Sequence, residues 1–260
     1  MAETQLAIVT QGLSRFFGTQ CAVNQVNIQV DAGTFYGFLG PNGAGKSTTI
    51  KMLTGLLAPS NGEIRIMGLD PRDRKSSVEI KRRIGVVPEN LALFENLTAT
   101  EYLTFVGRMF LLDRDTIRRR TADLLGVLGL DREEKKLALE YSHGMQKKLA
   151  FAAAMLPNPD LLFLDEPFEG IDAVTSKTVR DMLAEFVKRG STVFLTSHVL
   201  EIVERLCTHV GIISGGVLVE QGPLEELSGG KSLEQCFLEK VGSTGEASQK
   251  LSWLEEGTRR

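Results

Sequence analysis

The sequence is poor in cysteine and has no long apolar run. Its three cysteines, Cys21, Cys207 and Cys236, lie far apart and form no CxxC pair, so neither a disulfide framework nor a zinc site is predicted. No stretch approaches the roughly 20 apolar residues that cross a bilayer. The first residues show no basic start followed by an apolar run. We therefore expect a cytoplasmic protein with reduced thiols, and we expect another chain to cross any membrane that it serves.

An excess of positive charge is also missing. Thirty Lys plus Arg face 33 Asp plus Glu, which leaves a formal net charge of −3. Proteins that bind nucleic acid usually present a basic surface to its phosphates, so we expect no nucleic-acid partner. The arginine-rich segment 116–121 is interpreted as a solvated helix face and not as a nucleic-acid patch.

Apolar residues make up 42% of the 260 residues, and their pattern predicts an α/β protein. Residues 6–30 alternate in apolar character, which is typical of antiparallel strands with one buried face. Apolar residues recur at helical intervals over 97–130 and 175–188. Continuous apolar runs are typical of parallel strands covered on both faces, and they occupy residues 35–39, 161–166 and 192–198. The sequence thus predicts a parallel α/β core with a helical insertion.

The strongest functional signal is a glycine-rich loop of the form GxxxxGK[ST], between the strand at 35–39 and a helix expected over 47–57. In such a loop, backbone N–H groups and a helix N-terminus surround the β-phosphate of a nucleotide. Lys46 is predicted to bridge the β- and γ-phosphates, and Ser47 to offer a hydroxyl to Mg²⁺. A chance glycine-rich turn is the alternative interpretation. The predicted nucleotide-binding residues of this segment are Gly40, Pro41, Asn42, Gly43, Ala44, Gly45, Lys46, Ser47 and Thr48.

Two adjacent carboxylates end the apolar run at 161–166. Asp165 and Glu166 would be costly at the end of a buried strand unless a cation lay nearby, and Mg²⁺ supplies one. Asp165 is predicted to hold the metal, directly or through water, and Glu166 to polarise the water that attacks the γ-phosphate. A strand running into an acidic turn would look the same. Together with the glycine-rich loop, however, the pair indicates a phosphate-loop nucleoside triphosphatase.

Residues 141–156, YSHGMQKKLAFAAAML, resemble the signature segment of the ABC superfamily, in which a Leu-Ser-Gly-Gly-Gln loop opens a helix. Ser142 and Gly144 match the two positions that contact the γ-phosphate, although three neighbouring letters depart from the commonest ones. An ordinary helix start with Ser142 as its N-cap is the alternative. The chain thus resembles the ATP-binding subunits of ABC transporters from residue 5 to residue 222. The resemblance implies a RecA-like parallel sheet core with an antiparallel β subdomain and a helical insertion that carries the signature.

The same resemblance assigns roles to four further features. Phe17 corresponds to the aromatic that stacks on adenine, although a core-facing strand aromatic is the alternative. Residues 170–172 correspond to the loop that touches the opposing subunit. His198 corresponds to the switch histidine that reaches the γ-phosphate; without the family, a structural role would be the natural interpretation. Glu89 stands where most members carry Gln, so it still offers an oxygen to Mg²⁺ or water but loses two donors and adds charge.

The resemblance also implies a division of the chain. Residues 1–222 are expected to form the ATP-binding domain, with the helical insertion at about 96–145. Residues 223–260 form a C-terminal extension, and the segment after about 241 has too little apolar content for a core and is expected to be loose. Residues 95–112 carry more apolar bulk than one amphipathic face needs, so part of this segment is expected to receive a coupling helix of a membrane subunit.

The function implied is that of an ATPase whose cofactors are ATP and Mg²⁺. Two copies are expected to dimerise around two ATP and to drive an integral membrane permease from the inner face of the cell membrane. The Val-Pro-Glu and Tyr-Ser-x-Gly-Met forms look like subunits of multi-span exporters of drug, sodium or polysaccharide systems.

Two alternatives remain. A soluble ABC ATPase acting on ribosomes or DNA normally has tandem cassettes or a long coiled coil, and the sequence shows neither. A regulator without turnover is disfavoured because the hydrolytic set is complete, namely Lys46, Asp165, Glu166 and His198.

Overall fold

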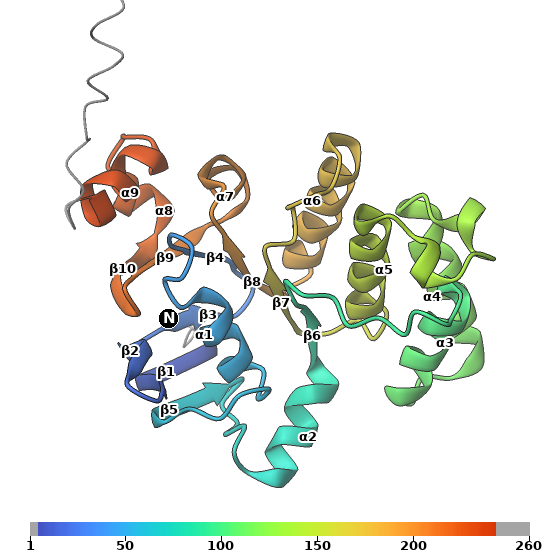
Figure 1. Ribbon diagram of the computed structural model, residues 1–260, viewed down its shortest axis with the longest axis horizontal. Helices are drawn as coiled ribbons and strands as arrows, with labels where there is room; N and C mark the ends of the chain where they lie inside the picture. Colours follow the sequence, from blue (N-terminus) through green and yellow to red (C-terminus); the bar gives the residue numbers. More distant parts are fainter. Residues whose placement is uncertain (1–4, 243–260) are drawn as a thin grey trace, which may run out of the picture.

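The structure, a computed structural model, describes residues 5–242, and Figure 1 shows how its elements are arranged. The strands of this range are β1 (Leu6–Phe17), β2 (Gln20–Val26), β3 (Gln29–Asp31), β4 (Phe35–Leu39), β5 (Asn61–Ile66), β6 (Ile84–Val87), β7 (Leu161–Asp165), β8 (Thr192–Ser197), β9 (His209–Ser214) and β10 (Val217–Pro223). The helices are α1 (Lys46–Leu53), α2 (Arg74–Arg83), α3 (Ala99–Met109), α4 (Arg114–Val127), α5 (His143–Met155), α6 (Ala173–Lys188), α7 (Leu200–Leu206), α8 (Leu224–Ser228) and α9 (Leu233–Val241), with 3-10 turns η1 (Asp131–Glu133) and η2 (Ala138–Glu140).

A four-stranded antiparallel sheet forms the N-terminal subdomain, as the alternating pattern predicts. β1 pairs with β2, β3 and β5, each time antiparallel. The buried hydroxyl of Thr10 on β1 has its hydrogen bonds satisfied. It donates to the carbonyl of Val26 at 2.9 Å and accepts from the amide of Ile28 at 2.8 Å. This sheet carries Phe17, at the end of β1, to the edge of the site described below.

The core is a six-stranded sheet in the order β10-β9-β4-β8-β7-β6. β4, β9, β8, β7 and β6 run parallel, and β10 is added antiparallel to β9. Every residue of β4, β7 and β8 is buried, which explains why these strands are continuous apolar runs. Because the carboxyl ends of parallel strands meet at one edge, the segments after β4, β7 and β8 lie together there. The predicted parallel α/β core is confirmed.

The helical insertion lies beside the β6 edge of the sheet (Figure 1). α3 begins with a capping box between Thr98 and Glu101. It meets α4 closely, since a β-carbon on Gly107 would collide with the side chain of Ile117. The expected boundary near residue 145 falls inside α5, which continues to Met155 and packs against β6. One helix therefore belongs to both the insertion and the core.

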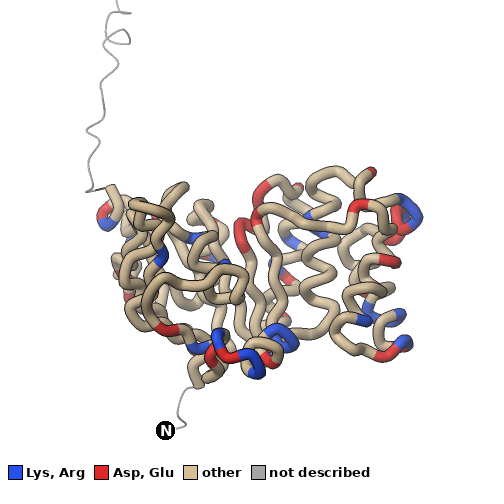
Figure 2. Tube along the Cα trace, turned by 60° about the horizontal axis from the view of Figure 1, so that its bottom comes forward, with Lys and Arg blue, Asp and Glu red and all other residues tan. Residues whose placement is uncertain are grey.

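The arginine-rich segment 116–121 lies on α4 and is only partly a solvated face. The side chain of Arg118 is 85% exposed, as expected. Arg120, however, donates to the carbonyl of Leu156 at 2.7 Å, and so ties α4 to the end of α5. Among the described residues, acidic positions lie close to basic ones at several places along the trace (Figure 2).

Several details differ from the sequence-based expectation. The helix expected over 47–57 ends at Leu53, because Gly55 follows in the left-handed region with a φ of 73°. α2 has no counterpart in the expectation, since Ile80 is its single buried residue and leaves no apolar stripe to detect.

In the part of the chain that the structure describes, no helix is long and apolar enough to cross a membrane.

The C-terminal extension folds back on the core as far as Val241. β10 runs to Pro223, across the boundary expected at residue 222, and α8 and α9 follow. α9 packs on α7, where the amide of Leu233 donates to the Glu204 carboxylate at 3.2 Å. The segment expected to be loose lies almost wholly outside the described residues.

Candidate functional site

The glycine-rich loop at residues 40–45 joins the buried strand β4 to the first residue of α1. Gly43 and Gly45 are left-handed, with φ values of 78° and 106°. A β-carbon on Gly40 would collide with the carbonyl oxygen of Ile213, and one on Gly45 with that of Ala22. Glycine is required at these positions because the backbone of neighbouring strands leaves no space for a side chain.

Lys46, the first residue of α1, is 6% exposed. Its ammonium group donates to the carbonyls of Gly40 at 2.8 Å and Pro41 at 3.3 Å. It also lies 3.5 Å from the Glu166 Oε1 atom. The lysine therefore adds a fixed positive charge to the positive end of the helix dipole, which makes the loop an anion-binding site.

Asp165 is the last residue of β7 and is 3% exposed. Its Oδ1 atom accepts a hydrogen bond of 2.5 Å from the Thr196 hydroxyl on β8. Burial raises the pKa of Asp165, and the charges of Glu89 and Glu166 raise it further, whereas hydrogen bonds from Thr196 and Ser47 lower it. A cation nearby would therefore stabilise the ionised form of this buried carboxylate.

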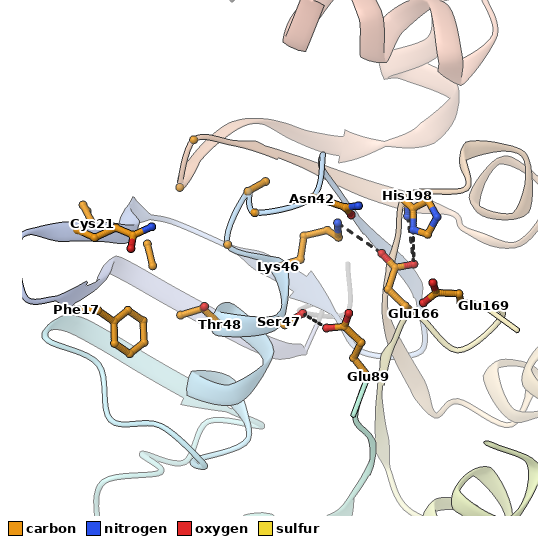
Figure 3. A pocket seen from close by; sticks show the side chains of 17 residues that line it. Phe17, Cys21, Asn42, Lys46, Ser47, Thr48, Glu89, Glu166, Glu169 and His198 are labelled. Carbon is orange, nitrogen blue, oxygen red and sulfur yellow. Dashed lines mark hydrogen bonds and ion pairs between the residues drawn. The ribbon is translucent and has the colours of Figure 1, made fainter. Parts of the chain in front are cut away.

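Glu166 directly follows β7, and its backbone is left-handed, with a φ of 48°. Its Oε2 atom lies 3.0 Å from the His198 Nδ1 atom and accepts from the His198 amide at 3.3 Å. Its Oε1 atom is buried and, although it faces Lys46, has no hydrogen-bond partner within residues 5–242. This carboxylate is therefore aimed at the loop, as Figure 3 shows, with one oxygen left to accept a further donor.

The remaining predicted ligands enclose the cavity. Ser47 donates its hydroxyl to the Glu89 Oε2 atom at 3.2 Å, which joins α1 to the loop after β6. Phe17 lies at the opposite end from Glu166, 47% exposed, with the Arg15 guanidinium 4.7 Å from its ring centroid (Figure 3). This exposure rules out the alternative of a core-facing aromatic. The cavity has a volume of about 700 Å³, within the range of small-molecule sites.

Ser142 and Gly144 do not line this cavity. Ser142 is the N-cap of α5, and its hydroxyl accepts from the Met145 amide at 3.3 Å. Gly144 instead faces the carbonyl of Gly170. Ser142 is thus the N-cap of α5, a role that fits both an ordinary helix start and a signature loop that opens a helix. Within one chain the signature residues are separate from the phosphate loop.

The loop at residues 170–172 leads into α6, and its last residue begins that helix. Asp172 is the N-cap, and its carboxylate accepts from the Thr175 amide at 2.9 Å and hydroxyl at 2.6 Å. These hydrogen bonds lower the pKa of Asp172. Helix capping within one chain is thus enough to explain an aspartate at position 172, and this role requires no opposing subunit.

Two residues that the sequence-based analysis did not select organise the site. Thr196 donates to Asp165 and accepts from the Glu166 amide at 3.1 Å, and its signal is a polar residue inside an otherwise apolar run. Lys147 on α5 donates to the backbone carbonyl of Glu166. It lies 19 residues from this partner, and no local pattern connects them.

The fold and the site together define a phosphate-loop nucleoside triphosphatase. The sequence model described as "ABC transporter" matches residues 23–169, more than half of the chain. The chain belongs to the ABC transporter family, as an ATP-binding subunit with ATPase activity.

Two curated relatives illustrate the likeness. The chain is 41% identical over 221 residues to the bacitracin transport ATP-binding protein of Bacillus licheniformis, covering 85% of this chain and 71% of that protein. It is 38% identical over 248 residues to the daunorubicin/doxorubicin resistance ATP-binding protein of Streptomyces peucetius, covering 95% and 74%.

Solved structures agree with this assignment. An ATP-binding subunit of an ABC transporter superposes with a TM-score of 0.84 at 30% identity, covering 90% of this chain and 98% of that one. A dimeric post-hydrolysis cassette bound to ADP and phosphate superposes with a TM-score of 0.77 at 24% identity, covering 84% and 98%, and supports the fold.

Proposed function

We propose that this chain is the motor subunit of an ABC exporter, in which two copies enclose two ATP molecules and drive a separate membrane-spanning permease. The observation that carries the proposal is the convergence of Lys46, Glu166 and His198 on one cavity beside the glycine-rich loop. The names of the relatives, one a bacitracin transport protein and one a drug resistance protein, support export as the direction.

In this proposal the triphosphate binds along the loop and the start of α1, held by backbone N–H groups and by Lys46. Phe17, exposed at the far end of the cavity, stacks on the adenine. Glu166 orients and polarises the attacking water through its Oε1 atom, which faces Lys46 but has no hydrogen-bond partner within residues 5–242. His198 fixes the other carboxylate oxygen and reaches toward the γ-phosphate.

Mg²⁺ fits the oxygen ligands of the site. The Ser47 hydroxyl, Glu89 and Asp165 would hold it, and burial of Asp165 beside other carboxylates favours a cation at this position. Within residues 5–242 no three His, Cys, Asp or Glu side chains are arranged to hold a metal by themselves. This agrees with magnesium, which commonly combines one or two carboxylates with waters and substrate phosphates. When bound, the ion would neutralise charge on the β- and γ-phosphate oxygens.

A second copy would complete the site. Ser142 is exposed, and neither Ser142 nor Gly144 reaches the cavity of its own chain. We propose that each copy presents these two residues, at the N-terminus of α5, to the γ-phosphate held by the other copy. Residues 170–172, packed beside Gly144, would lie at the same interface.

The permease would dock on an apolar groove between α3 and the loop after β6. The groove has a volume of about 440 Å³ and is lined by side chains that include Leu56, Leu91 and Tyr102. Beside it, α3 divides the apolar residues of 95–112: Leu103 is fully buried, whereas Met109 is 67% exposed. This proposal places the protein on the inner face of the cell membrane.

Co-purification from native membranes tests the proposed partner. The tagged parent should recover a multi-span membrane protein, and Leu56→Glu should lose it, because Leu56 lines the groove and is 69% exposed. Leu238→Glu, at a 58% exposed position on α9, is the matched control and should retain the partner. Recovery of ribosomal or DNA-bound proteins in place of a membrane protein would favour the soluble alternative.

His198→Ala should lower the turnover number by about 100-fold while ATP affinity changes little, because the imidazole contacts Glu166 and no part of the adenine end. Phosphate release and equilibrium ATP binding measure the two quantities. His209→Ala, which removes a histidine on β9 outside the cavity, is the control and should retain the parent rate. Equal losses of turnover and binding would assign His198 a structural role.

A further inference from the structure

Lys147 lies in the second turn of α5, and only 5% of its surface is exposed. Its stem borders a narrow apolar cleft with Val87, Phe151 and Ile171. Its ammonium group donates to the carbonyl of Glu166 at 3.1 Å and to that of Glu169 at 2.5 Å. Within residues 5–242, no carboxylate oxygen lies within 4.0 Å of this group. The lysine is thus bound to the backbone of the turn that follows β7.

A buried lysine is unusual because removing an ammonium group from water is costly. Burial lowers the pKa of Lys147, while the more distant charges of Glu169 and Glu166 act in the opposite direction. A methionine would fill the same apolar cleft without a buried charge. The cost of burying the ammonium group is therefore offset by the two carbonyls that it binds and by the attraction of the Glu169 and Glu166 carboxylates.

The turn that Lys147 binds needs such support. Glu166 is left-handed at a φ of 48°, a conformation that is unfavourable for a residue with a side chain. The turn's own hydrogen bond, from the Glu169 amide to the Glu166 carbonyl, is long at 3.4 Å. The two donations from Lys147 hold the ends of this turn together, and the turn decides where the Glu166 carboxylate points.

We propose that Lys147 is a positioning residue for hydrolysis, which fixes the turn after β7 and thereby aims the Glu166 carboxylate at the attacking water. The inference rests on the role proposed above for Glu166. Lys147 lies on the same helix as Ser142 and Gly144, one turn further on. The signature of each copy is therefore tied mechanically to the hydrolytic carboxylate of that same copy, and not only to the nucleotide of the other.

The test compares Lys147→Met, which keeps the apolar stem, with Lys147→Arg, which keeps a charged donor. Lys147→Met should lower the turnover number at least about 10-fold, while the KM for ATP and the equilibrium affinity for ATP stay within about twofold of the parent. Lys147→Arg should recover most of the lost rate, because a guanidinium can also donate to two carbonyls. Lys75→Met, at an exposed lysine on α2, is the matched control and should retain the parent rate.

The outcomes separate the positioning role from others. A Lys147→Met rate within twofold of the parent contradicts it, as does a Lys147→Arg rate no better than that of Lys147→Met. Parallel losses of turnover, ATP affinity and melting temperature would assign Lys147 to folding alone. If Lys147→Met is insoluble, Lys147→Leu replaces it with the same expected loss of turnover, since leucine is also apolar and has no donor. A parent protein that hydrolyses no ATP would instead overturn the proposed function itself.

Discussion

The Glu166→Gln protein is expected to bind ATP, to fail to hydrolyse it, and to accumulate as a dimer. Glutamine keeps the length of the side chain and can still accept from the His198 amide. It loses the negative charge that polarises the attacking water, so turnover should fall by about 10²–10⁴-fold. The Lys46 ammonium, 3.5 Å from the replaced oxygen, loses its carboxylate partner and remains free to hold the phosphates.

Dimerisation follows because ATP would be bound by both copies at once. A ligand that binds the associated form more tightly than the single copy shifts the equilibrium toward association. With hydrolysis blocked, each ATP stays between the loop of one copy and Ser142 and Gly144 of the other. The parent, which empties its sites, should remain mostly monomeric.

Size-exclusion chromatography with light scattering, with and without ATP, measures the shift. The double variant Glu166→Gln, Ser142→Arg is the control: it should bind ATP and stay monomeric, because a long side chain would fill the position of the γ-phosphate contact. A Glu166→Gln protein that binds nucleotide but stays monomeric at high ATP would show that the isolated subunit does not form the sandwich.

Lys46→Ala should abolish ATPase activity and weaken ATP binding by about 10–100-fold, because a charged hydrogen bond contributes about 1.5–3 kcal/mol. The carbonyls of Gly40 and Pro41 lose their donor, and Glu166 loses the cation that it faces. With that cation gone, less positive charge would offset the repulsion between the triphosphate and the carboxylates of the cavity.

Phosphate release and calorimetric titration with ATP check this expectation. Lys51→Ala is the matched control, because Lys51 is an exposed lysine on the same helix, outside the cavity. It should retain the parent rate and affinity. Turnover of Lys46→Ala within a factor of two of the parent would contradict the assignment of the phosphate loop.

The sequence predicted those parts of the fold whose residue pattern can be explained in only one way, such as strands buried on both faces. β4 and β7 are continuous apolar runs because both of their faces are buried, and the expected ranges agree with the structure to within a residue. Lys46 was located by a motif whose spacing is fixed by the loop itself. α7 was missed because Val203 is its single buried residue, too little for a periodic signal.

The parts of the site that the sequence did not predict depend on contacts between distant segments. Thr196 reaches Glu166 across 30 residues, and Lys147 reaches it across 19. Neither contact can be predicted from the sequence, because each depends on how β7, β8 and α5 are placed beside one another in the fold. The left-handed backbone of Glu166 is equally hidden, since residues with a side chain seldom adopt it.

That backbone has a consequence for how position 166 can vary. Glycine would occupy a φ of 48° freely, and asparagine or aspartate more easily than glutamate, so the backbone taken alone does not favour the glutamate that hydrolysis needs. Stability and activity therefore pull in opposite directions at this residue. In a copy of this chain that no longer has to hydrolyse ATP, a substitution at residue 166 that removes the backbone strain would stabilise the fold. We therefore expect this residue to be among the first to be replaced in such a copy.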